Sequence, residues 1–162
     1  MGAGGKALEE LARRALSGKG SHVKTKDVFS GLEWRAAGLK PHGVPHSVYQ
    51  LLMHMSFWQD WVVAWLAGKD PAVPRHASGS WPAEGRPPSR RDWDGAVQQF
   101  RQGLGRLERA CRGADLTSGR GRSTRIEMLC AIAAHNSYHA GQVAFLRQLL
   151  SRWPPPSGGL TW

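Results

Sequence analysis

Apolar residues recur every three or four positions in four segments of the chain, a spacing that places them on one face of an α-helix. Residues that start or stop helices bound these segments, which run from Ala7 to Leu16, from Ser47 to Ala67, from Ser89 to about Arg112 and from Thr124 to about Arg152. No stretch alternates apolar and polar residues as a half-buried strand does. The pattern therefore predicts an all-α chain, and its 162 residues suit a single domain with one core.

The three longest segments begin with side chains that cap helices. Ser47 is a good N-cap residue directly after a proline and a histidine. Thr124, with Glu127 three positions later, has the capping-box pattern, and Ser89 with Asp92 has an approximate one. Glycine or proline follows each segment, so the sequence also marks where each helix ends.

Two long connections separate these segments. Residues 18–46 carry one or two helical turns, from about Thr25 to Gly38, which are expected to form a bent arm with the first segment. Residues 69–88 contain five prolines and two glycines, so they are expected to form an irregular crossover. A crossover of about twenty residues is uncommon unless function or topology requires it.

Three histidines lie on faces that the periodicity assigns to the core. His135 and His139 are four residues apart, so their rings leave the same side of a helix about one turn apart. His54 lies on the apolar stripe of residues 47–67. Three imidazoles on facing helices can bind zinc or nickel and leave a position for water or substrate. Alternatively, they are core histidines that hydrogen-bond to other groups and contribute only to stability.

Other residues are candidates for a supporting role near these histidines. Gln142 lies three residues after His139 on the same side of the helix. Its side chain is a candidate to hold a metal-bound water or a substrate oxygen. Alternatively, Gln142 is only a polar residue at the rim of the site. Trp58 and Trp81 are candidates to form the walls of a substrate pocket, although tryptophan on an apolar stripe often belongs to the core.

Further polar residues near the motif are expected to have other roles. Asn136 and Tyr138 lie off the main stripe, so they are expected to bond to adjacent helices. His46, two turns before His54, is a candidate for the edge of the site. The histidines in loops are expected to be solvated: His22, His42 and His76.

Short motifs that contain these histidines agree with one known family in both residue type and spacing. They are Pro45-His46-Ser47, His54 with Phe57-Trp58, Ser80-Trp81-Pro82, His135-Asn136-x-Tyr138-His139-x-Gly141-Gln142, Arg147 and Trp153-Pro154. With these motifs, the sequence resembles the DinB-like superfamily of metal-binding four-helix bundles over about residues 5–154. The domain is therefore expected to span 5–154, with 1–4 and 155–162 as flexible tails. Alternatively, Trp162 packs on a dimer partner.

The resemblance implies a fold and a metal site. The bundle would have an up-down-down-up order, in which the long crossover joins the second and third main helices in parallel. His54, His135 and His139 would be the ligands of a divalent metal, usually zinc or nickel. Members of the superfamily often dimerise, so a homodimer is expected.

The resemblance also implies a choice of chemistry. Some members transfer thiols such as bacillithiol or mycothiol, and related proteins isomerise maleylpyruvate with a thiol cofactor. A bound metal lowers the pKa of a water or a thiol.

No carboxylate is obviously placed as a base, because Asp60 faces away from His54 and Glu127 is expected to cap a helix. A thiol S-transferase is therefore favoured. The alternatives are a hydrolase of a small substrate and a non-catalytic bundle that binds a partner or DNA in a stress or DNA-damage response.

Charge and cysteine content limit the partners and the location. The net charge of +10 is spread over both halves of the chain, so a nucleic-acid surface is possible but not favoured. The basic surface would also suit an anionic thiol cofactor. Cys111 and Cys130 form no disulfide framework, and no signal peptide or membrane span is visible, so a cytoplasmic protein is expected.

Overall fold

The computed structural model describes residues 2–159, and this part of the chain forms five α-helices and one small antiparallel sheet. Four long helices make up the bundle: α1 (Ala3–Ser17), α3 (Val48–Leu66), α4 (Arg90–Cys111) and α5 (Arg125–Leu149). Shorter elements lie in the connections, namely η1 (Thr25–Asp27), α2 (Trp34–Ala37) and η2 (Ala77–Ser80). The end of the predicted C-terminal tail, including Trp162, lies outside the described residues.

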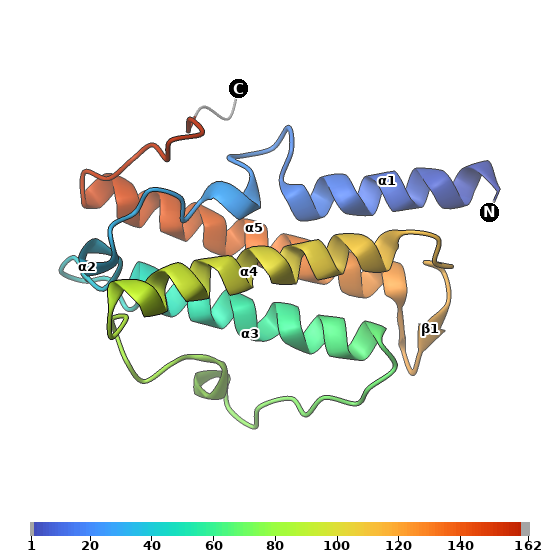
Figure 1. Cartoon of the computed structure of the whole chain (residues 1–162). Coiled ribbons are helices and arrows are strands. Elements are labelled where there is room, and N and C mark those ends of the chain that lie inside the picture. Colours follow the sequence, from blue (N-terminus) through green and yellow to red (C-terminus); the bar gives the residue numbers. More distant parts are fainter. Residues whose placement is uncertain (1, 160–162) are drawn as a thin grey trace.

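The long helices follow the predicted up-down-down-up order (Figure 1). Helices α3 and α4 run in the same direction, whereas α1 and α5 run in the opposite direction. Helices α1 and α3 each pack against both α4 and α5. The crossover between α3 and α4 spans the length of the bundle, as a parallel pair requires. The all-α fold class predicted from periodicity is therefore confirmed.

The predicted capping residues begin the helices as expected. The Ser47 hydroxyl accepts from the Gln50 N–H at 3.1 Å, and the Gln50 side chain accepts from the Ser47 N–H at 3.1 Å. Thr124 and Glu127 form the same reciprocal pair at the start of α5. Because these bonds satisfy N–H groups that a helix leaves free, they hold the first turns of both helices that carry the histidines.

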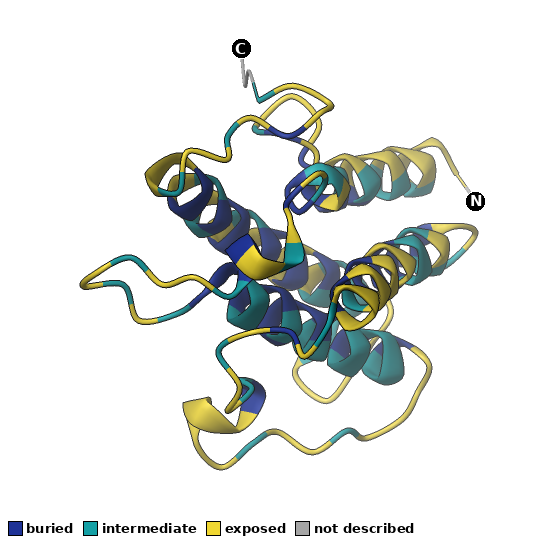
Figure 2. Ribbon diagram, turned by 60° about the vertical axis from the view of Figure 1, so that its left-hand side comes forward, coloured by how far each residue is buried: buried dark blue, intermediate teal, exposed yellow. Residues whose placement is uncertain are grey.

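The core consists of two apolar clusters that follow one another along the bundle. Figure 2 shows that the buried sides of the helices face one another. One cluster contains Phe29 of the arm, Phe100 of α4 and Val143 of α5. The other contains Leu16 of α1 and Ile132 of α5. The histidines of α5 lie between these clusters, because they follow Ile132 and precede Val143 along the helix.

The structure differs from the sequence prediction in two details. A two-residue hairpin, β1 (Gly119–Arg120) and β2 (Ser123–Thr124), precedes α5, and such short strands leave no alternation to detect. Helix α5 ends at Leu149, about three residues early. The one or two helical turns predicted between Thr25 and Gly38 are present as a 3-10 turn and a four-residue helix that ends at Gly38. None of the helices in residues 2–159 is long and apolar enough for a membrane crossing.

Candidate metal centre

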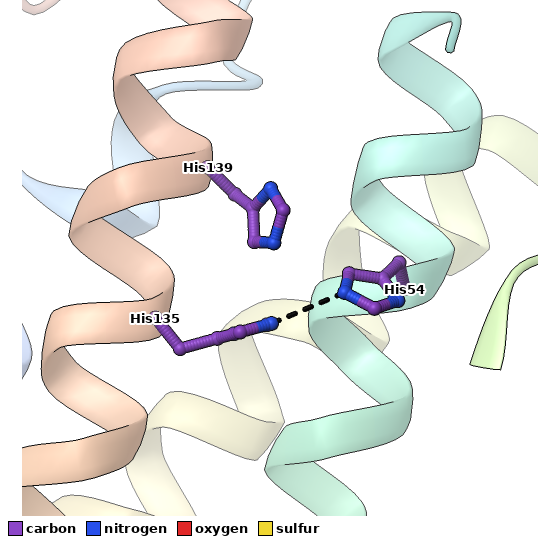
Figure 3. Close-up of side chains that lie close together, drawn as sticks. All are labelled: His54, His135 and His139. Atoms are coloured by element: carbon purple, nitrogen blue, oxygen red, sulfur yellow. Dashed lines mark hydrogen bonds between the residues drawn. The ribbon is translucent and has the colours of Figure 1, made fainter. Parts of the chain in front are cut away.

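The three histidines predicted as ligands meet between α3 and α5 (Figure 3). His135 and His139 extend from successive turns of α5 towards His54 on α3. One nitrogen of each ring lies within 4.8 Å of the corresponding nitrogens of the other two. The Nε2 atoms of His54 and His135 are 3.1 Å apart.

This arrangement fits a divalent metal. Zinc binds histidine nitrogen at about 2.0–2.1 Å, so two ligand nitrogens in a tetrahedral site lie about 3.3–3.4 Å apart. The His54–His135 separation of 3.1 Å is close to that value. The donor set of three imidazoles suits zinc, nickel or copper and leaves room for a fourth ligand. The geometry therefore supports an open metal site.

Hydrogen bonds outside the cluster orient two of the rings. The Nδ1 atom of His54 lies 3.2 Å from the Ser80 carbonyl, and Nδ1 of His139 lies 2.6 Å from Oε1 of Gln142. Each Nδ1–H can therefore donate to an oxygen, which leaves the lone pair of Nε2 for a metal. Such bonds to metal-binding histidines select the tautomer and hold the ring in place.

The environment also keeps the rings uncharged. Burial lowers the pKa of His54 and of His135 from 6.5 to about 4, and repulsion from His139 acts in the same direction on both. Burial lowers the pKa of His139 as well, although its hydrogen bond to Gln142 opposes this effect. The three rings are therefore neutral at pH 7, the form that binds metal ions.

Trp81 covers the centre from the crossover. Its ring stacks on His54 with a centroid distance of 3.9 Å and on His46 with a distance of 3.7 Å. Trp58 lies edge-on at 6.5 Å from both His54 and His135. Both tryptophans that the sequence predicted as pocket walls thus lie beside the histidine cluster. His46 is linked to the cluster by its stacking on Trp81, which stacks on His54.

Comparison with protein families agrees with this geometry. A family model described as the DinB superfamily matches residues 22–143, about three quarters of the chain. The chain belongs to the DinB superfamily. The matched region contains all three histidines of the centre. No curated protein matches the chain significantly.

Two interactions of this DinB-superfamily protein were not evident in its sequence. The bond from His54 to Ser80 joins α3 to the crossover, where no periodicity indicates which residues turn inward. The stacking of His46 on Trp81 likewise depends on how the two loops fold against α3. The Ser80-Trp81-Pro82 motif was the only sequence signal in this region, and it did not indicate which residues Ser80 and Trp81 contact.

Two expectations for polar residues are wrong. His22 is half-buried, and its nitrogens pair with the Val23 carbonyl and the Ser137 hydroxyl, whereas the other two loop histidines are exposed. Asn136 is fully buried, yet its amide has no hydrogen-bond partner among residues 2–159. Because α1, α3 and η1 all pack on α5, positions beside the histidine stripe are buried too. Tyr138 is exposed.

We expect Gln142→Ala to weaken metal binding about 10- to 100-fold, because His139 loses the acceptor that orients its ring. Gln142→Glu retains an acceptor oxygen and should restore most of the affinity. Gln148→Ala, at an exposed position of the same helix, is the matched control. Competition with a chelator measures the affinity, and equal values for Gln142→Ala and Gln148→Ala would contradict the proposed role of Gln142.

Proposed function

We propose that this DinB-superfamily protein is a metal-dependent thiol S-transferase. His54, His135 and His139 hold zinc or nickel, and the co-substrate is a low-molecular-weight thiol of the bacillithiol or mycothiol type. The observation that carries the proposal is a cluster of three neutral histidines that, among the described residues, includes no carboxylate. When bound, the metal supplies a positive charge that favours the thiolate form of a thiol.

The lack of a nearby base favours a thiol over water as the nucleophile. Asp60 is paired with Arg106 of α4. Glu127 accepts from the Thr124 N–H at 2.7 Å, and this bond, with that to the Thr124 hydroxyl, lowers the pKa of Glu127. Both carboxylates therefore have other partners. Attack by water needs a base to take up its proton, whereas a thiolate is already deprotonated.

The reacting thiol must come from another molecule. Cys111 is buried, its thiol donates to the Leu107 carbonyl, and burial raises its pKa to about 11. Cys130 is exposed on α5, and the histidine cluster contains no cysteine from residues 2–159. In the proposed reaction, the sulfur of the co-substrate bonds to an electrophilic carbon. The leaving group departs with its electron pair, and the thiol proton passes to solvent.

The proposal also retains the expected assembly and location. The protein would act as a homodimer, as the resemblance implies, and in the cytoplasm, which suits its two unpaired cysteines.

The test is a transfer assay with protein purified without a histidine tag and loaded with zinc or nickel. The substrates are bacillithiol or mycothiol and a chlorodinitrobenzene electrophile. We expect thioether formation that depends on the metal and stops when a chelator removes it. Hydrolysis of esters or amides without added thiol would favour the hydrolase. Absence of turnover with DNA binding that weakens steeply with salt would favour a non-catalytic protein.

A further inference from the structure

A separate cavity of about 240 Å³ lies one helical turn from the histidine cluster. Leu51, three residues before His54 on α3, forms one side of it, and Phe145 and Leu146 of α5 form another. Val44 and Pro45 of the connection before α3 complete the apolar part of the lining.

Two polar residues connect this cavity to the metal centre. Gln142 lines the cavity, and its side chain also accepts from His139. His46 lines the cavity and stacks on Trp81, which in turn stacks on His54. A molecule in the cavity is therefore adjacent to the groups that support the cluster.

The lining selects for an uncharged group. Among the described residues, no Asp, Glu, Lys or Arg lines the cavity, although the chain as a whole has a net charge of +10. The cavity thus offers a mainly apolar surface, with His46 and Gln142 as its polar side chains, the usual composition of a small-molecule site.

The volume limits the size of the occupant. A dry apolar cavity of about 150 Å³ accepts benzene, so 240 Å³ is sufficient for a phenyl ring with a small substituent. A sugar or a nucleotide would leave most of its polar groups without partners against this lining.

We propose that this cavity binds the apolar part of the electrophilic substrate, an aryl group or a branched alkyl group of similar size. The inference rests on the proposed transferase function, because it places the electrophilic carbon beside the histidine cluster. The substrate class is then a small electrophile that carries such a group next to its reacting carbon.

The first experiment measures the cavity without any reaction. Fluorobenzene is titrated with the purified protein and followed by ¹⁹F NMR. We expect line broadening for the wild type and its loss in Val44→Trp, because the larger side chain fills the cavity. Val73→Trp places the same side chain in the exposed crossover and should bind like the wild type. Phe145→Ala removes an exposed wall and should weaken binding even if Val44→Trp does not fold.

The second experiment connects the cavity to the transfer reaction. The kcat/KM ratio for benzyl bromide over iodoacetamide should fall at least about tenfold in Val44→Trp, because the phenyl ring loses its apolar contacts. The ratio should be unchanged in Val73→Trp. Absence of fluorobenzene binding, or an unchanged ratio in a folded Val44→Trp variant, would overturn the inference. Fluorobenzene binding without any thiol transfer would instead overturn the proposed function and the role of the cavity in it.

Discussion

Replacement of His135 by alanine is expected to weaken divalent metal binding by more than about a hundredfold. Loss of a residue that only hydrogen-bonds to a metal ligand lowers metal affinity about 10- to 100-fold, and loss of a ligand itself lowers it further. The substitution would also remove Nε2 of His135, which lies 3.1 Å from Nε2 of His54. Metal content after dialysis against a weak chelator measures the effect, with circular dichroism as the check on helical structure.

The matched control is His42→Ala, which removes an exposed loop histidine from the same protein. This variant should retain the metal content of the wild type. If wild type and His135→Ala contain equally little metal and differ only in thermal stability, the cluster is a set of core histidines. That result would contradict both the metal centre and the proposed transferase.

Arg147→Ala is expected to lower the free energy of unfolding by about 3–5 kcal/mol, because each of three buried or half-buried carbonyls that loses its donor costs about 1–3 kcal/mol. Arg147 is 1 % exposed, and its Nη1 donates to the carbonyls of Val28 at 2.6 Å and Ser30 at 2.9 Å. Its Nε donates to the Arg152 carbonyl at 3.0 Å. The side chain therefore joins the arm to the end of α5, and its removal leaves three carbonyls without this donor.

Arg147→Lys should recover little of this stability, because an ammonium cannot donate in the fixed directions of a guanidinium. Arg152→Ala is the control, since the Arg152 side chain is exposed and bonds only to the neighbouring Ser151 carbonyl in the described structure. Its effect should stay within about 0.5 kcal/mol. Urea unfolding followed by circular dichroism measures all three variants. A loss below about 1 kcal/mol for Arg147→Ala would show that water replaces the guanidinium at these carbonyls.

The bundle helices were largely predictable because the signals that form them are local. Apolar spacing and capping pairs involve residues three or four positions apart, as in Thr124 with Glu127. The connections were less predictable, because their conformations depend on contacts with distant elements. The 3-10 turn at Thr25–Asp27, for example, packs against α1, α4 and α5.

The candidate site divides in the same way. Helix geometry alone places His135 and His139 one turn apart on one face, so their pairing was determined by the sequence. The role of Gln142 was only partly foreseen, because its bond to His139 is local but the cavity beside it is formed by three segments.

Only the tertiary structure decided that His54 meets the other two histidines and that Ser80 and Trp81 hold it there. These contacts depend on the relative position of α3, α5 and the crossover, which is determined by core packing and not by any local pattern. The sequence by itself determined the helices, their capped starts and the spacing of the histidine pair. It could not determine the third ring or the cavity, because residues more than eighty positions apart approach one another only when the whole core packs.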